Sequence, residues 1–254
     1  MLKLFVKKLP VLPAAVFALL IALVTPAAQA YDGNYAYRSG YTAVQIPAEI
    51  IFLENADAVV MLETFDSDGK SIRTGSGFII SDTGLVVTNL HVIANAARAE
   101  ITLFNKTVYA VRGVHAMSEE YNIVIISIDS DENNLKHLTL ANSDLVETGN
   151  SVYTIGSPLG LVNSMSTGII SNTKREVAGE TLIQFTAPIS FGSGGSPLFN
   201  TAGLVVGITS SSFSYGQNLN LAVPINRVKE LEPGECIPLD TLLQRSKGDI
   251  GNDG

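Results

Sequence analysis

Short apolar runs separated by turn residues recur along most of this chain, and they constrain its fold more than any other feature. Runs such as GLVVTNL, NIVIISI and GLVVGITS are rich in Val, Ile and Thr, and DSDGK and SDTG suit hairpin turns. This pattern predicts an all-β sandwich or barrel with few short helices. Since about twelve such runs are too many for one small barrel, we expect two six-stranded barrels. They would span about residues 45–146 and 147–231, joined through ANSDLVETGNS.

The N-terminal thirty residues have the three parts of a secretory signal. Lysines precede an apolar run at residues 11–24, and Ala28-Gln29-Ala30 follows it as a small-residue cleavage site. The alternative is an uncleaved membrane anchor, but the apolar run is short and Pro13 interrupts it. No later segment is long enough to cross a bilayer. We therefore expect an exported protein, periplasmic or secreted, whose mature chain begins at Tyr31.

The two ends of the expected double barrel are polar. Residues 31–44 are predicted to form a loose leader, and residues 232–254 a flexible C-terminal tail. The whole chain has 16 basic and 24 acidic side chains, and removing the three lysines of the signal leaves a net charge of −11. Such a chain would repel nucleic acid, so nucleic acid is not an expected partner.

The sequence contains no pattern that predicts a cofactor or a metal. It has neither a dinucleotide fingerprint nor a P-loop, and His115 and His137 do not cluster with His91 at metal-ligand spacing. Cys236 is the only cysteine, which excludes an internal disulfide. We interpret it as a structural thiol, with an intermolecular disulfide as the alternative.

The segment GSGFIISDTGLVVTNLHVIANA, residues 75–96, is the strongest candidate functional motif. A strand, a turn and a second strand would place His91 at the start of a short helical turn, held rigidly by the barrel. A single histidine is more often a core residue, but the surrounding blocks favour a functional one.

Five blocks in order, TNLHVI, YNIVIISI, GSPLGL, TAPISFGSGGSPLFN and GQNLNLAVPIN, resemble those of trypsin-like serine proteases of the HtrA (Deg) type. The resemblance covers about residues 45–231. It implies two Greek-key barrels with the active site in the cleft between them. It also implies a Ser-His-Asp triad, with His and Asp on the first barrel and Ser on the second. The chain leaves no room for the PDZ peptide-binding domain of such proteins.

Carrying the triad over residue by residue gives a degenerate site. His91 matches the general base, but Asn122 stands at the Asp position of the block YNIVIIS. The ungapped match around GSGGSPLFN puts Gly192 at the first glycine, Ser193 at a variable position and Gly194 at the nucleophile. Glycine has no side chain, so no acyl-enzyme can form there. An Asp-to-Asn change in a serine protease triad costs on the order of 10⁴ in kcat, although some cysteine proteases use Asn in this role.

Two serines of the same turn are alternative nucleophiles. Ser193 is displaced by one residue, about 3.8 Å of backbone, and a misplacement of about 1 Å can cost roughly 10²-fold in rate. Ser196 is a weaker alternative. An active endopeptidase would therefore need Ser193 with His91, or a rearranged turn.

Other parts of the resemblance survive intact. The N–H groups of Gly192 and Gly194 would form the oxyanion hole. Thr209, Ser210 and Ser211 occupy the segment that pairs with an extended substrate as an added strand, which needs no nucleophile. We therefore predict an inactive or severely impaired protease homologue that binds extended polypeptide or a partner protein, with a possible homo-oligomer. The alternatives are an active serine endopeptidase and a purely structural or assembly subunit.

Overall fold

The computed structural model describes residues 45–130, 134–157, 164–210 and 219–241. The predicted signal and leader lie outside the described residues, as does the end of the predicted tail. Among the described residues there is no helix with the length and apolar character needed to cross a membrane.

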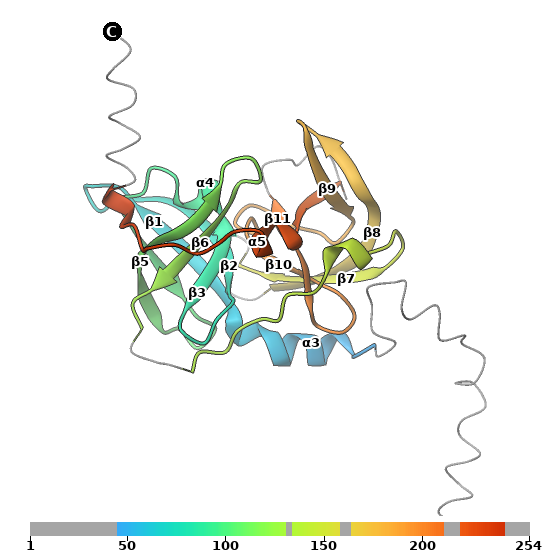
Figure 1. The fold of residues 1–254 in the computed structure, drawn as a ribbon. Helices are drawn as coiled ribbons and strands as arrows, with labels where there is room; N and C mark the ends of the chain where they lie inside the picture. The colour runs from blue at the N-terminus through green and yellow to red at the C-terminus, as the bar shows by residue number, and fades with distance from the viewer. Residues whose placement is uncertain (1–44, 131–133, 158–163, 211–218, 242–254) are drawn as a thin grey trace, which may run out of the picture.

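Two closed antiparallel barrels stand side by side, which confirms the predicted double barrel (Figure 1). The first has the strand order β1-β2-β3-β6-β5-β4, and the second, read from β7, has the equivalent order β7-β8-β9-β12-β11-β10. The strands of the first are β1 (Val59–Phe65), β2 (Ser71–Ile79), β3 (Leu85–Asn89), β4 (Arg98–Thr102), β5 (Val108–Ser118) and β6 (Ile123–Ile128). Those of the second are β7 (Ser151–Gly156), β8 (Ser164–Val177), β9 (Glu180–Phe185), β10 (Pro197–Phe199), β11 (Val205–Ser210) and β12 (Asn220–Pro224).

The apolar core joins the barrels rigidly. Every residue of β6 is buried, which explains why its sequence IVIISI does not alternate between apolar and polar residues. The larger apolar cluster includes Ile125 of the first barrel together with Phe199 and Ile208 of the second. Because interiors of this kind are close-packed, side chains carried by different barrels keep fixed positions relative to one another.

Within the described ranges the helices are few and short, as the sequence predicts. They are α3 (Ala48–Asn55), α4 (Leu90–Ile93) and α5 (Asn226–Lys229), with 3₁₀ turns η1 (Ala56–Ala58) and η2 (Ser143–Leu145). α3 runs beneath both barrels in Figure 1, with Ile51 fully buried. Just before it, the N–H of Ile46 donates to the carbonyl of Thr201 at 2.9 Å, which fixes this segment to the second barrel.

The segment after Leu231 corrects the prediction that a flexible tail begins there. Residues 232–241 return from α5 across the first barrel (Figure 1). Ile237 exchanges two main-chain hydrogen bonds of 2.8 Å with Val114 of β5, and the N–H of Gly234 donates to His115. A Cβ at Gly113 would lie 2.4 Å from the Ile237 carbonyl oxygen, so glycine allows the close approach. Residues 242–254 lie outside the described residues.

Candidate functional site

His91 and Asn122 come from neighbouring strands of the first barrel. β3 leads directly into α4, which carries His91, and Asn122 stands just before β6. The Asn122 carbonyl accepts hydrogen bonds from the N–H of Leu90 at 2.9 Å and from the side-chain amide of buried Asn89 at 3.2 Å. Asn122 has a left-handed backbone with φ of 50°, a conformation that asparagine tolerates better than most residues. Both backbones are therefore held in fixed positions.

The side chain of Asn122 contacts His91 twice. Its Oδ1 accepts a hydrogen bond from the His91 backbone N–H at 2.9 Å, and its Nδ2 lies 2.7 Å from Nδ1 of the imidazole. Because the first contact requires the amide oxygen, the second must be a donation from the amide N–H to Nδ1. Nδ1 is then an acceptor, and the neutral ring carries its proton on Nε2. A triad base needs the other tautomer, which accepts the nucleophile's proton at Nε2.

The surroundings of His91 also disfavour its cationic form. Burial lowers the pKa of the imidazole below its usual value. A hydrogen bond from the ring to an amide oxygen would raise the pKa, but that oxygen of Asn122 is engaged by the His91 N–H. The charge of Arg73 lowers the pKa further, and its guanidinium donates to the carbonyl of His91. His91 is therefore a half-buried neutral imidazole whose proton lies on Nε2, the wrong nitrogen for base catalysis.

We expect a ¹⁵N NMR titration of His91 to give a pKa below its ordinary value of 6.5, with the Nε2–H tautomer above it. Asn122→Asp should raise that pKa, because a carboxylate accepts the Nδ1–H and stabilises the imidazolium. The folded-state pKa of wild type is lowered. The contribution of His91 to stability is therefore complete above pH 6.5 and is lost as the pH falls from there toward the folded pKa. An Nδ1–H tautomer in neutral wild type would contradict the tautomer assignment.

The glycine-rich turn of the second barrel is fastened to β2 of the first. The N–H of Ser76 donates to the Gly194 carbonyl at 2.9 Å, and the Ser76 hydroxyl donates to the Gly192 carbonyl at 2.7 Å. Gly192 and Gly195 have left-handed backbones with φ of 88° and 87°, whereas Gly194 does not. Within the described ranges, no hydrogen bond takes up the N–H of Gly192 or of Gly194. The turn thus keeps the main-chain donors expected of an oxyanion hole.

Both alternative serines are buried in the glycine-rich turn. Ser193 is 5% exposed, and its Oγ accepts a 3.4 Å hydrogen bond from the N–H of Ser190 in its own turn. Among the described residues no hydrogen bond joins Ser193 to His91. Ser196 is fully buried, and a Cβ at Gly156 would lie 2.2 Å from its hydroxyl. The structure therefore brings His91 and Asn122 together and leaves both serines within the packed turn.

The segment predicted to bind substrate is partly used by the fold itself. Thr209 donates its N–H to the Ser196 carbonyl and accepts from the N–H of Gly195, each at 2.9 Å. Its hydroxyl donates to the Ser193 carbonyl at 2.6 Å. The main chain of Thr209 is therefore occupied by the glycine-rich turn and cannot pair with an added strand. Ser210 ends β11, and Ser211 lies outside the described residues.

Three residues with clear roles in this site were missed by sequence reasoning. Ser76 anchors the glycine-rich turn, Asn89 holds the Asn122 carbonyl, and Arg73 holds the carbonyl of His91. A signal existed for Ser76 and Asn89, since each is a polar residue at a buried strand position. Arg73 is exposed on β2 and has no comparable signal.

Comparison with known proteins finds relatives of one kind. Residues 75–208 match the family described as trypsin-like peptidase domain. The chain is 35% identical over 189 residues to zebrafish (Danio rerio) serine protease HTRA1A, covering 69% of this chain and 38% of the relative. It is 34% identical over 190 residues to a probable periplasmic serine endoprotease DegP-like of Rickettsia conorii, covering 71% and 37%. The chain thus spans well under half the length of these relatives.

Solved structures similar to this chain are also serine proteases. The structure described as HtrA-type protease AlgW with tripeptide is 30% identical, with a TM-score of 0.65 over 72% of this chain and 62% of that one. The serine endoprotease from Yersinia pestis is 26% identical, with a TM-score of 0.64 over 74% and 65%.

Proposed function

Since the chain belongs to the trypsin-like serine peptidases of the HtrA type, we propose that it is an exported homologue that binds extended polypeptide without cleaving it. The observation that carries the proposal is the double contact of Asn122 with His91, which fixes the imidazole in the non-basic tautomer. It coincides with a glycine at the nucleophile position, on a different barrel. Two separate steps of the triad chemistry are therefore missing.

The chemical argument concerns proton transfer and bond formation. In the family mechanism, a serine hydroxyl loses its proton to Nε2 of histidine as its oxygen attacks the carbonyl. Here Gly194 offers no oxygen, and Nε2 of His91 already carries a proton. Ser193 could supply an oxygen only if the turn opened, because its hydroxyl faces Ser190. The site can therefore form neither the acyl intermediate nor the imidazolium that precedes it.

The binding argument rests on the parts that remain. The N–H groups of Gly192 and Gly194, which have no hydrogen-bond partner in the part of the chain that the structure describes, suit a peptide carbonyl. We place the bound peptide beside the end of β11 at Ser210, where pairing through the main chain would require no catalytic side chain. One solved relative, AlgW, is described with a tripeptide. A polypeptide is thus the partner that best fits these main-chain donors.

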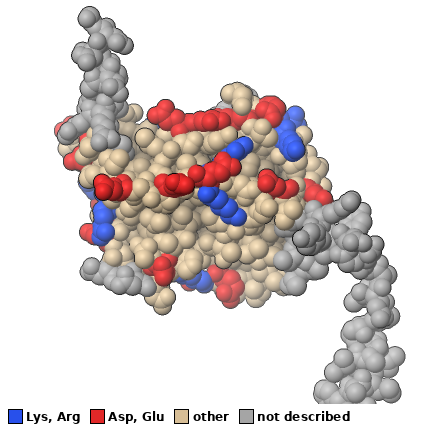
Figure 2. All heavy atoms as spheres, viewed as in Figure 1, with Lys and Arg blue, Asp and Glu red and all other residues tan. Residues whose placement is uncertain are grey.

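The proposed export rests on the sequence of residues 1–30 and on a relative named as periplasmic. Carboxylates predominate over basic side chains on the face shown in Figure 2. This agrees with the acidic composition and with the proposal that nucleic acid is not a partner.

The test uses one set of fluorescent unfolded peptides and two readouts on the purified protein. We expect binding by fluorescence anisotropy, and intact peptides by mass spectrometry after long incubation. Phe191, which is 86% exposed on the glycine-rich turn, should contribute to the cleft, so Phe191→Ser should weaken binding. Leu53→Ser, at a 65% exposed apolar residue of α3, is the matched control and should not.

Each readout can overturn one part of the proposal. Cleavage that disappears in Ser193→Ala would establish an active protease with a displaced nucleophile. Absence of binding to any peptide would favour a structural or assembly role instead.

A further inference from the structure

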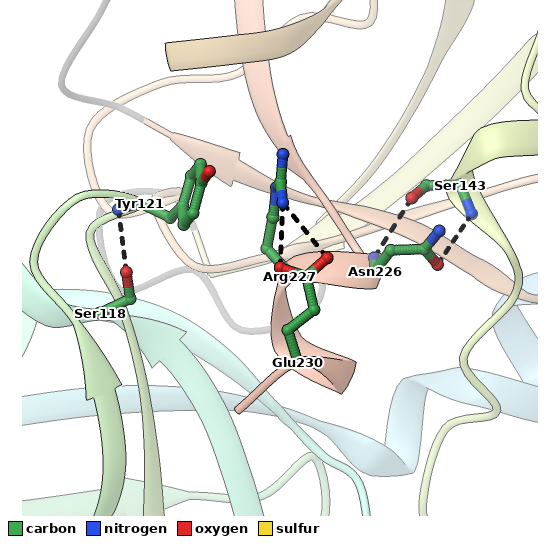
Figure 3. A network of polar contacts seen from close by, with 6 residues as sticks. All are labelled: Ser118, Tyr121, Ser143, Asn226, Arg227 and Glu230. Atoms are coloured by element: carbon green, nitrogen blue, oxygen red, sulfur yellow. Dashed lines mark hydrogen bonds and ion pairs between the residues drawn. The ribbon is translucent and has the colours of Figure 1, made fainter. Parts of the chain in front are cut away.

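An aromatic side chain of the first barrel is stacked under a guanidinium of the second, directly beside the candidate site. Tyr121 immediately precedes Asn122, and Arg227 lies on α5, which follows β12. The Cζ atom of Arg227 lies 4.6 Å from the centre of the Tyr121 ring, within the range of a cation–π contact. Figure 3 shows the two side chains facing each other across the junction of the barrels. The contact therefore links the C-terminal end of the second barrel to the residue next to Asn122.

The guanidinium of Arg227 is fixed by a carboxylate at the end of its own helix. Its Nη1 donates to both carboxylate oxygens of Glu230, at 2.9 and 3.2 Å, one turn along the chain (Figure 3). Asn226 exchanges two hydrogen bonds of 3.2 Å with Ser143 of η2, which belongs to the crossover between the barrels. α5 is thus fixed to the crossover, and the guanidinium has a defined position over the ring.

Several contacts restrain the conformation of Asn122. A left-handed φ of 50° is uncommon outside glycine, although asparagine adopts it more readily than most residues, and the Asn122 N–H donates to the Glu119 carbonyl at 3.2 Å. On one side the Asn122 carbonyl is held by Asn89 and Leu90. On the other side the chain leading into it is Tyr121, whose N–H donates to the Ser118 hydroxyl at 3.2 Å. The ring of Tyr121 is the side-chain contact that ties this approach to the second barrel.

We infer that Tyr121 and Arg227 are positioning residues. Their contact between the barrels keeps Asn122 in its left-handed conformation and so determines which nitrogen of His91 carries the proton. The inference rests on the His91–Asn122 geometry used in the proposed function, but it concerns how that geometry is maintained and not whether peptides bind or are cleaved. The second barrel therefore influences the tautomer of His91 and also carries the glycine-rich turn.

The position of Arg227 makes the contact testable without disrupting the core. Arg227 is about a third exposed, at 34%. It also lines a polar cavity of about 360 Å³, together with Glu230 and, from the β8–β9 hairpin, Lys174 and Glu176. Shortening Arg227 enlarges a space that is already open and leaves no buried void, so we expect the variants to fold.

The experiment reads His91 directly by ¹⁵N NMR and amide hydrogen exchange, in the purified protein. Wild type should show one tautomer, protonated at Nε2, and a slowly exchanging His91 backbone N–H. Arg227→Ala and Tyr121→Leu should each give mixed tautomers and about two- to fivefold faster exchange of that N–H, as expected for the loss of a partly exposed cation–π contact. Tyr121→Phe keeps the ring and should resemble wild type, since the cation contacts the π face.

The matched control is Arg98→Ala. Arg98 lies 3.7 Å from the centre of the Phe65 ring and pairs with Glu100, so it reproduces the same chemistry on β4. It should leave both His91 readouts unchanged. If Arg227→Ala and Tyr121→Leu fold and leave the His91 tautomer and exchange rate as in wild type, the positioning role is wrong. That result would leave the proposed peptide binding untouched, because the latter is measured separately.

Discussion

The Asn122→Asp/Gly194→Ser double variant is expected to react with a fluorophosphonate probe and to hydrolyse unfolded protein, whereas wild type should do neither. The aspartate can keep the hydrogen bond from the His91 N–H with one oxygen and accept Nδ1–H with the other. This moves the proton of the neutral imidazole to Nδ1 and frees Nε2. The serine then supplies the missing oxygen on the second barrel. We measure both activities against wild type under identical conditions.

The backbone at position 194 favours this outcome. Gly192 and Gly195 have left-handed φ values, but Gly194 does not, so a residue with a side chain can occupy its backbone conformation. Its carbonyl is already anchored by the N–H of Ser76 at 2.9 Å, an interaction that does not depend on the side chain. The new hydroxyl would therefore lie on a turn that is held in place before the substitution.

The single variants separate the two defects. Asn122→Asp alone should remain unlabelled, because no nucleophile is present. Gly194→Ser alone should be labelled about 10⁴-fold more slowly than the double variant, since the imidazole keeps the wrong tautomer. A triple variant that adds His91→Ala should be inactive. A folded double variant without any labelling would mean that the cleft itself has changed shape, which would also weaken the proposal that it binds polypeptide.

The barrel strands and the pairing of Asn122 with His91 could be predicted from the sequence because both depend on side-chain patterns. The barrel strands are recognisable from apolar runs between turns, and the ungapped block YNIVIIS indicates that Asn122 faces His91. The structure brings these two residues into contact. The tautomer, however, follows from a backbone N–H that takes the amide oxygen, and no sequence pattern records that contact.

Other features could not be predicted because they join distant segments through main-chain or exposed atoms. The segment of residues 232–241 pairs with β5 through one isolated bridge, between Ile237 and Val114, which is too short to give its sequence the periodicity of a strand. Tyr121 and Arg227 each have the character of an ordinary surface residue in sequence. Their contact depends on how the two barrels are placed relative to each other. A contact of this kind can be identified only from the three-dimensional arrangement of the two barrels.

Gly195→Ala is expected to destabilise the protein by about 3 kcal/mol or more, which is a large effect for the addition of one methyl group. Gly195 has a φ of 87°, where a Cβ is strained. That Cβ would also lie 2.1 Å from the Ser76 carbonyl oxygen and 2.6 Å from the Thr88 hydroxyl. Both contacts belong to the first barrel, so relief would require the glycine-rich turn to move away from it.

Urea unfolding of Gly195→Ala and Gly149→Ala separates the two causes. Gly149 has a similar φ of 92°, but a Cβ there would meet nothing within 4 Å, so its substitution should cost only the backbone term of about 1 kcal/mol. Equal losses of unfolding free energy in the two variants would show that small movements relieve the clash with Ser76. The glycine-rich turn would then not be tightly held. The expected difference implies that Gly195 is required to join the barrels whether or not the site is catalytic. A glycine-rich turn of this kind is therefore needed for the double barrel with or without a nucleophile, and its presence in a sequence is evidence for the fold and not by itself for peptidase activity.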